Sequence, residues 1–318
     1  MIRSVIAGTG GYLPARSLSN DELAAAYGLD TSDSWISERT GIRRRHMAAP
    51  GETTADMAAA AAREALAAAG ADASEVDAII LATATPDSAF PSTATRVQEK
   101  LGIRQGFSFD ISAACTGFIY AVGVADSMLR AGQCRSALVI GAEAFTRILD
   151  WTDRGTCVLF GDGAGAVLMR ASEDAGDTPN PRGILSTHLH SDGRHGDILQ
   201  VEGGMVRMAG REVFRHAVSK LASAVDEALA ANGLAKSDVQ WLVPHQANLR
   251  IIDAMGRKLG LPPERVVVTV DRHANTSAAS IPLALAEATR DGRIGAGDLV
   301  LMEAIGGGLT WGAALARF

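Results

Sequence analysis

The sequence repeats itself, and this repeat limits the possible folds more than any other feature. Residues 63–80 read REALAAAGADASEVDAII and residues 226–243 read DEALAANGLAKSDVQWLV, which align without a gap and are identical at eight of 18 positions. Each segment predicts an alanine-rich helix that stops at a glycine, then a short loop and a buried strand. The same helix–strand unit is therefore expected twice.

A second pair of segments supports the first. Residues 112–130 and residues 277–290 both begin with Ser-Ala-Ala and both have the spacing of a helix. Each predicted helix leads into a short apolar run, at residues 137–140 and residues 299–302, which predicts a buried strand.

A third pair completes the pattern, because residues 165–170 resemble residues 312–317. Alanine-rich composition alone can make two helices look alike, but three resemblances in the same order indicate a duplication. We place the two related α/β halves at 1–171 and 172–318. Strands that alternate with helices predict mostly parallel, buried sheets covered by helices.

The composition is that of a globular protein, with 47% hydrophobic and 21% charged residues and a net charge of −6. The negative charge disfavours nucleic-acid binding. We find no apolar run long enough for a signal peptide or a membrane helix, so a cytoplasmic location without a membrane partner is expected. The three cysteines, Cys115, Cys134 and Cys157, are an odd number and favour free thiols.

Cys115 lies where a predicted strand turns into a predicted helix. Residues 107–111 alternate as a strand does, and the spacing from Phe118 onwards is helical. The free N–H groups and the positive dipole end at a helix start are expected to favour a thiolate and to stabilise an oxyanion. The alternative is a buried, inert cysteine, an interpretation that fits Cys134 and Cys157.

Two further polar residues also follow predicted buried strands. His245 comes directly after residues 241–244, and Asn275 follows residues 266–270. Ligand sites in parallel sheets lie beyond the carboxyl ends of the strands. A single histidine is more often structural, but the three groups at strand ends predict a catalytic centre of Cys115, His245 and Asn275.

Four motifs resemble those of the beta-ketoacyl-acyl-carrier-protein synthase III family. They are residues 110–118 (DISAACTGF), 245–250 (HQANLR), 275–280 (NTSAAS) and 306–312 (GGGLTWG). The resemblance spans nearly the whole chain. It implies the thiolase fold, a five-layered αβαβα sandwich of duplicated halves, and a homodimer.

The resemblance also implies an activity. This is the decarboxylating Claisen condensation of a short acyl-CoA, acetyl-CoA by default, with malonyl-acyl carrier protein, which initiates fatty-acid synthesis. Coenzyme A and the phosphopantetheine arm of the carrier protein would be parts of the substrates, so no resident cofactor is expected.

The resemblance assigns a role to each reactive group. Cys115 would accept the acyl group as a thioester, and its N–H and that of Gly307 would form the oxyanion hole. His245 and Asn275 would donate hydrogen bonds to the malonyl thioester and stabilise the enolate left by loss of CO2. A thiolase needs a second cysteine, but none follows Cys157. Elongating synthases have a second histidine in place of Asn275, so the CoA-primed type is favoured.

Binding residues follow from the same resemblance. Coenzyme A would contact Thr31, Trp35, Arg39, Arg154 and Asn248. The acyl pocket would be bordered by Ile305 and by Phe90 of the partner subunit. The carrier protein would contact Gln246, Ala247, Asn248, Leu249 and Arg250, together with Arg257 and Lys258. The three basic residues share one face of a predicted helix, and the alternative interpretation is a solvated face without a partner.

A histidine-rich segment could suggest a metal site. His188, His190 and His195 lie close to Asp192 and Asp197 in the sequence. Their spacing fits no standard zinc pattern, so no metal is expected.

Three departures from the family pattern leave the primer open. Ala274 stands where glycine is common, and Ile305 and Leu309 stand where phenylalanine is common. Propionyl, branched or longer acyl groups are alternatives to acetyl. Three other functions also stay open: a specialised acyltransferase or condensing enzyme of secondary metabolism, an acyl-CoA hydrolase or O-acyltransferase, and a non-catalytic binding module.

Overall fold

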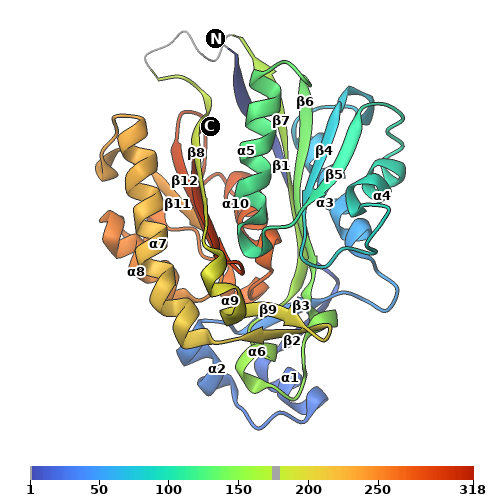
Figure 1. The fold of residues 1–318 in the computed structure, drawn as a ribbon, viewed down its shortest axis with the longest axis vertical. Coiled ribbons are helices and arrows are strands. Elements are labelled where there is room, and N and C mark those ends of the chain that lie inside the picture. The colour runs from blue at the N-terminus through green and yellow to red at the C-terminus, as the bar shows by residue number, and fades with distance from the viewer. Residues whose placement is uncertain (1, 174–179) are drawn as a thin grey trace.

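The computed structural model describes residues 2–173 and 180–318 and arranges them in five layers (Figure 1). Two β-sheets alternate with three layers of helices, so that one pair of helices lies between the sheets and the others cover the outer faces. This arrangement is the predicted αβαβα sandwich. None of the helices in these two ranges combines the length and the apolar character needed to cross a membrane.

The first sheet belongs to the first half of the chain. Its five strands are, in spatial order, β1 (Arg3–Tyr12), β7 (Asp162–Ser172), β6 (Ser136–Ala144), β4 (Ala78–Ala82) and β5 (Phe107–Ile111). β4 pairs in parallel with β5 and β6, whereas β7 is antiparallel to both β1 and β6.

The second sheet belongs to the second half. Its four strands are, in order, β11 (Trp241–Pro244), β12 (Leu299–Gly306), β13 (Thr310–Arg317) and β8 (Gly183–Ser191). Only β11 and β12 are parallel. The prediction of mostly parallel sheets is therefore wrong, because strands such as β13 return beside their predecessor through a short turn instead of a crossover helix.

The two sheets have matching strand orders. β1, β7, β6 and β4 correspond to β8, β13, β12 and β11. At the place of β5, the described part of the second half has only a single parallel bridge between Leu242 and Val266.

Six helices make the other three layers. α3 (Thr54–Ala68) and α4 (Thr93–Lys100) cover the first sheet, and α7 (Gly210–Ala231), with α8 (Leu249–Leu259) beside it, covers the second. α5 (Gly117–Arg130) and α10 (Ser280–Arg290) lie between the sheets and pack against strands of both.

The repeated segments adopt the structures predicted for them. α3 and α7 are each followed by a glycine with positive φ, 57° at Gly70 and 62° at Gly233. Each glycine is followed by a 3₁₀ turn, at Ala73–Glu75 or Lys236–Asp238, and then by a parallel strand, β4 or β11. Positive φ costs glycine little, which explains why both copies stop the helix with this residue.

The central strands β4, β6 and β12 are buried on both faces, and their alternate side chains therefore enter different cores. On β12, Leu299, Leu301 and Ile305 pack toward α7 and α8, whereas alternate residues such as Val300 and Met302 join the core around α5 and α10. The central core takes side chains from both sheets, so it holds the two halves together.

The smaller elements gather at one end of the sandwich, at the bottom of Figure 1. They are β2 (Arg16–Ser19), α1 (Asn20–Tyr27), α2 (Asp33–Thr40), β3 (Arg44–Met47), α6 (Arg154–Cys157), β9 (Leu199–Glu202), β10 (Met205–Met208) and α9 (Val270–His273). Together with α8, several of them surround the cavity described next.

Candidate active site

Cys115, His245 and Asn275 line one cavity of about 660 Å³, although they are far apart in the sequence. Cys115 comes from the first half, and the other two residues come from the second half. The structure therefore brings together the three groups that the sequence indicated.

Cys115 lies in the 3₁₀ turn Ala114–Thr116, directly before α5. Gly306 lies against this turn so closely that a Cβ on it would be 2.6 Å from the Cys115 nitrogen, so no other residue fits there. The thiol is 5% exposed, and burial raises its pKa to about 12. The prediction that the helix start favours a thiolate in the free protein is wrong, because burial outweighs the effect of the helix end.

The two N–H groups expected to form the oxyanion hole belong to neighbouring turns. Within the described ranges, the N–H groups of Cys115 and Gly307 donate no hydrogen bond to another residue. The Thr310 hydroxyl joins the turns, because its oxygen lies 3.0 Å from the Ala113 carbonyl oxygen and 3.2 Å from that of Gly307. Both N–H groups therefore have no backbone partner in the described residues, and of the two residues Cys115 lines the cavity whereas Gly307 does not.

His245 is oriented by Ser280, at the start of α10. Its Nδ1 lies 2.7 Å from the Ser280 Oγ, and that oxygen also accepts a hydrogen bond of 3.3 Å from the Gln246 N–H. We infer that the Ser280 hydroxyl donates its hydrogen to Nδ1, which leaves the hydrogen of the neutral ring on Nε2. Burial lowers the pKa of His245 to about 3, so the ring is a neutral donor at neutral pH.

Asn275 is held by the backbone on both sides. Its N–H donates to the Leu159 carbonyl at 2.9 Å, and its Oδ1 accepts from the Ser277 N–H at 2.8 Å. Because the oxygen is engaged, the amide NH2 is the group left to act as a donor. Ala274 precedes it with φ of 58°, a conformation that suits glycine, which accounts for the glycine common at this position.

Trp35, on α2, lies at the cavity between two arginines. The guanidinium carbons of Arg39 and Arg154 are 4.6 and 4.7 Å from the centre of the indole ring. Asn248 also lines the cavity, and its Nδ2 donates to the Arg39 carbonyl at 3.1 Å. Thr31 is not among the residues that line this cavity. An aromatic ring with two fixed cations is suited to a planar base and its phosphates.

The residues predicted to contact a carrier protein differ in their exposure. Arg250, Arg257 and Lys258 are exposed on α8, whereas Ala247 and Leu249 are partly buried. The prediction for Gln246 is wrong, because this residue is fully buried.

The Gln246 side chain forms four hydrogen bonds within the protein. It donates to the carbonyls of Pro244 and Val267, and it accepts from the N–H groups of Thr269 and Val270. It therefore holds the loop after β11 in place, and no atom is free to contact a partner.

The two residues predicted to border the acyl pocket lie in opposite environments. Ile305 lines the cavity and is 5% exposed. Phe90 is 85% exposed and does not line the cavity of its own chain.

Several residues of the site could not be recognised from the sequence. One wall of the cavity contains Leu199, Met208, Arg211 and Phe214, from β9, β10 and α7. These side chains carry no motif, so only the fold brings them to the site. Ser280 lies within the motif NTSAAS, which was the one available signal for its role.

The histidine side chains of this segment lie against acidic side chains. His188 and His190 contact the same carboxylate, Glu227, at 3.1 and 2.6 Å, and His195 lies 3.7 Å from Asp192. Within residues 2–173 and 180–318, no group of three or more side chains is arranged to bind a metal ion.

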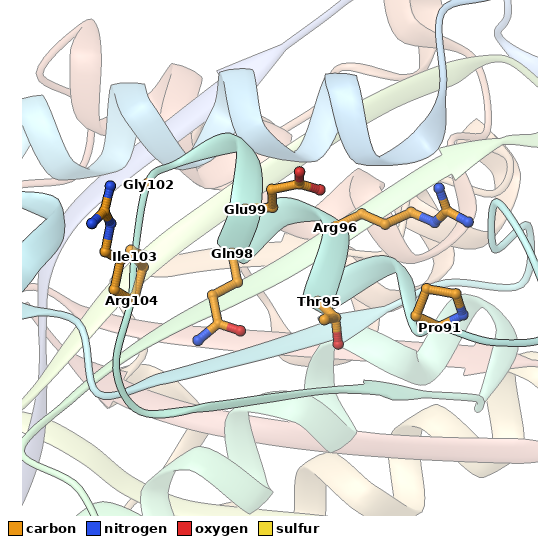
Figure 2. Close-up of a pocket in the computed structure, with 8 residues that line it drawn as sticks. All are labelled: Pro91, Thr95, Arg96, Gln98, Glu99, Gly102, Ile103 and Arg104. Atoms are coloured by element: carbon orange, nitrogen blue, oxygen red, sulfur yellow. The ribbon is translucent and has the colours of Figure 1, made fainter.

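A second hollow, of about 600 Å³, lies along α4 and the loop that follows it (Figure 2). Its labelled side chains lie along α4, as Arg96 and Gln98 do, or on the loop that follows it, as Arg104 does, and they do not converge on one point. Its lining residues include no cysteine and no histidine, so the chemistry favours the cavity at Cys115 as the active site.

Comparison with known proteins gives a consistent result. The family described as 3-oxoacyl-[acyl-carrier-protein] synthase III matches residues 109–193, and the C-terminal part of that family matches residues 229–318. The chain is 66% identical to beta-ketoacyl-[acyl-carrier-protein] synthase III of Acidiphilium cryptum, over the full length of both, and 63% identical to that of Rhodospirillum centenum, over 100% of this chain and 99% of the relative.

Solved structures agree with the sequence relatives. The fold superposes on 3-oxoacyl-[acyl-carrier-protein] synthase III from Aquifex aeolicus with a TM-score of 0.94 and 48% identity, over 99% of this chain and 100% of that one. It superposes on the priming beta-ketosynthase of the R1128 polyketide pathway with a TM-score of 0.91 and 36% identity, over 99% and 96% of the two chains.

Proposed function

Because the chain belongs to the beta-ketoacyl-acyl-carrier-protein synthase III family, we propose that its cavity carries out both steps of a decarboxylating condensation. The chain is an acyltransferase that joins an acyl-CoA to malonyl-acyl carrier protein and so initiates fatty-acid synthesis. The proposal for its residues is supported chiefly by one observation, the meeting of Cys115, His245 and Asn275 in a single cavity.

In the first step, the sulfur of Cys115 attacks the thioester carbonyl of the acyl-CoA. The developing oxyanion accepts hydrogen bonds from the N–H groups of Cys115 and Gly307. The bond to the coenzyme A sulfur then breaks and that sulfur takes up the proton given up by the Cys115 thiol, which leaves an acyl-enzyme and free coenzyme A. Trp35 and its two arginines bind the coenzyme A end that remains outside.

In the second step, malonyl-acyl carrier protein enters the same cavity. The Nε2–H of His245 and the amide of Asn275 donate hydrogen bonds to its thioester oxygen. Loss of CO2 leaves an enolate on that oxygen, and these two donors stabilise its charge. The enolate carbon attacks the carbonyl carbon of the acyl-enzyme, the bond to the Cys115 sulfur breaks, and this sulfur takes up a proton from solvent to restore the thiol. No resident cofactor or metal is part of this proposal.

The experiment that tests the proposal is mass spectrometry of the protein after incubation with a set of acyl-CoAs. Cys115 is expected to gain the mass of the acyl group, and addition of malonyl-acyl carrier protein is expected to discharge it as a ketoacyl product. Discharge as a free acid without malonyl-acyl carrier protein would instead indicate a hydrolase. Absence of any mass gain at Cys115 would contradict the proposal.

Replacing Ile305 by phenylalanine is expected to narrow the range of primers. The side chain lines the cavity, and a larger ring there takes up space that a long acyl chain needs. We expect the acylation rate to fall more for propionyl, branched and longer primers than for acetyl-CoA. Single-turnover acylation with each primer measures this, and an equal change for all primers would contradict it.

Charge reversal on α8 is expected to affect one substrate only. Arg257 and Lys258 are exposed and do not line the cavity, unlike Arg250. Because carrier proteins are acidic, the double variant Arg257→Glu, Lys258→Glu is expected to raise the KM for malonyl-acyl carrier protein about tenfold and leave that for acetyl-CoA unchanged. Steady-state kinetics with each substrate measures both values.

The matched control for this variant is Arg182→Glu. Arg182 is an exposed arginine beside the C-terminal Phe318, whereas the C-terminus and α2 lie at opposite ends of the molecule (Figure 1). An equal rise in KM for the control, or for acetyl-CoA, would count against carrier binding at α8.

A homodimer is also part of the proposal. The aromatic ring of Phe90 is almost fully exposed, and β5 is an edge strand with partly exposed, stacked Phe107 and Phe109. An exposed apolar edge of this kind favours pairing with a second chain. Sedimentation is expected to give about twice the 33.0 kDa mass of one chain.

A location in the cytoplasm, expected from the sequence, likewise stays a proposal.

A further inference from the structure

The turn that carries Cys115 is strained and is not held by a cap of its own. Ala114, directly before the cysteine, has φ of 45°, a conformation that residues other than glycine seldom adopt. Thr116, directly after it, is at the N-cap position of α5, yet its side chain forms no capping hydrogen bond there. Because a strained backbone persists only where its surroundings fix it, the restraint on this turn must come from another part of the chain.

The Thr116 hydroxyl binds to the second half of the chain. Threonine is favoured at an N-cap because its oxygen can accept from an N–H of the first helical turn. Here the side chain is fully buried, and its hydroxyl donates to the Thr310 carbonyl at 3.0 Å, across 194 positions of the sequence. The hydroxyl therefore connects the start of α5 to the second half instead of stabilising the helix locally.

The Thr310 hydroxyl makes the return contact. Its oxygen lies 3.0 Å from the carbonyl oxygen of Ala113, 3.1 Å from the hydroxyl oxygen of Thr116 and 3.2 Å from the carbonyl oxygen of Gly307. Its single hydrogen is shared among these oxygens. Ala113 and Thr116 lie on the two sides of Cys115, so one residue of the second half contacts the chain both before and after the cysteine.

Thr310 is itself fixed in place by its neighbours. It begins β13, which pairs with β12 on one side and with β8 on the other. Leu309, directly before it, exchanges two backbone hydrogen bonds with Asp192, at 3.0 and 2.8 Å. The turn around Cys115 is therefore tied to one of the most firmly held points of the second sheet.

The loop before Thr310 lies directly on the backbone of the cysteine. A Cβ on Gly306 would be 2.6 Å from the Cys115 nitrogen and 3.1 Å from the Thr116 nitrogen, so the two backbones are in close contact. That Cys115 nitrogen carries the N–H of the proposed oxyanion hole. A shift of the loop against the turn would therefore change the position of this donor.

We propose that the side chains of Thr116 and Thr310 form a hydroxyl clamp that positions the N–H of Cys115 for the oxyanion of the acylation step. Neither threonine lines the cavity, so both are positioning residues and not catalytic ones. The clamp adds no chemical step. It rests on the proposed function, in which this N–H donates to the thioester oxygen while the sulfur attacks.

The clamp matters because the reacting groups come from different halves. Cys115 belongs to the first half, whereas His245 and Asn275 belong to the second, and the clamp fixes one against the other. A hydrogen bond to an oxyanion depends steeply on distance and angle. A misplacement of about 1 Å can slow a reaction by about 10²-fold without weakening substrate binding. The effect of the clamp is therefore expected in the rate of acylation.

The test is the single-turnover rate of acylation at saturating acetyl-CoA, followed by mass spectrometry. Thr310→Val and Thr116→Val keep the branched shape and remove the hydroxyl, and each is expected to slow acylation by about 10–10²-fold. Thr310→Ser and Thr116→Ser keep the hydroxyl and are expected to stay within about threefold of the wild-type rate. The Kd for coenzyme A, measured by calorimetry, should not change in any of them. Thr310→Ala and Thr116→Ala serve as second variants if a valine variant does not fold.

Three further measurements separate positioning from general damage. Alkylation of Cys115 by iodoacetamide forms no oxyanion, so its rate is expected to stay at the wild-type value in the valine variants. Release of CO2 from malonyl-acyl carrier protein depends on His245 and Asn275 and should also be unchanged. Because both hydroxyls act through the same contact, the variant with valine at both Thr116 and Thr310 should be slowed by less than the product of the two single factors.

Thr54→Val is the matched control. Thr54 is also fully buried, its hydroxyl donates to the Thr85 carbonyl at 2.8 Å, and it does not line the cavity. Its loss removes a buried hydroxyl–carbonyl bond of the same kind, so it is expected to lower the midpoint of thermal unfolding as Thr116→Val does. Acylation in this control should proceed at the wild-type rate.

Each result decides between the hypotheses. Wild-type acylation in both valine variants would overturn the clamp and leave the proposed function intact. Serine variants as slow as the valine variants, or an equal slowing of alkylation, of CO2 release or of the Thr54 control, would also overturn it, because such results indicate lost packing. If Cys115 of the unaltered protein gains no acyl group, the proposed function itself is wrong.

Discussion

Cys115→Ser is expected to form no detectable acyl-enzyme and to lower turnover about 10⁴-fold or more. The hydroxyl is a far weaker nucleophile than the thiol. The histidine that lines this cavity, His245, has its Nδ1 hydrogen-bonded to Ser280 and so cannot use that atom as a base. The oxyanion hole and the coenzyme A contacts stay intact in this variant. The loss should therefore appear in the rate and not in substrate affinity.

Mass spectrometry with acetyl-CoA and binding measured by calorimetry test the two parts of this prediction. Cys134→Ser is the matched control, since Cys134 is an equally buried free thiol at the other end of α5 and does not line the cavity. The control should acylate at the wild-type rate. Acyl transfer that survives in Cys115→Ser, or that is lost in Cys134→Ser, would place the nucleophile elsewhere.

His245→Ala and Asn275→Ala are each expected to slow decarboxylation of malonyl-acyl carrier protein by about 10²–10³-fold. Each variant removes one donor to the enolate oxygen, and loss of one such donor raises a barrier by on the order of 3 kcal/mol. Acylation of Cys115 should continue in both, because its oxyanion hole consists of backbone N–H groups. If both donors bind the same oxygen, the rate of decarboxylation in the double variant should fall by less than the product of the two single-variant factors.

Release of CO2 from labelled malonyl-acyl carrier protein measures the second step, and mass spectrometry measures the first. His273→Asn is a suitable control, because His273 is also buried and neutral, through a pKa lowered to about 4, but lies outside the cavity. If a His245 variant failed to acylate Cys115 but decarboxylated malonyl-acyl carrier protein normally, His245 would act in the first step and not in the second.

Ser280→Ala would test how the histidine is oriented. Without the Ser280 hydroxyl, Nδ1 has no donor in the described structure and the ring hydrogen can move between the two nitrogens. A smaller loss of decarboxylation than in His245→Ala, with normal acylation, is the expected outcome.

The sequence predicted much of this protein because its signals are local or repeated. The helical and strand periods around residues 63–80 and 226–243, with their glycine stops, depend on neighbours along the chain. The motifs around Cys115, His245 and Asn275 are equally local, and they were sufficient to indicate the family and the residues that meet in the cavity. The division of the chain at residue 171 stays a prediction.

Tertiary structure decided the properties that depend on distant contacts and on burial. Gln246 seemed a surface residue within its motif, but contacts with Val267, Thr269 and Val270 bury it. The helix start at Cys115 was visible in the sequence, but the direction of its pKa shift was not, since desolvation depends on groups brought from both halves. The segments of Glu143 and Ser277 are 134 positions apart in the sequence, and only the packing of the 3₁₀ turn Ser277–Ala279 on β6 brings them together.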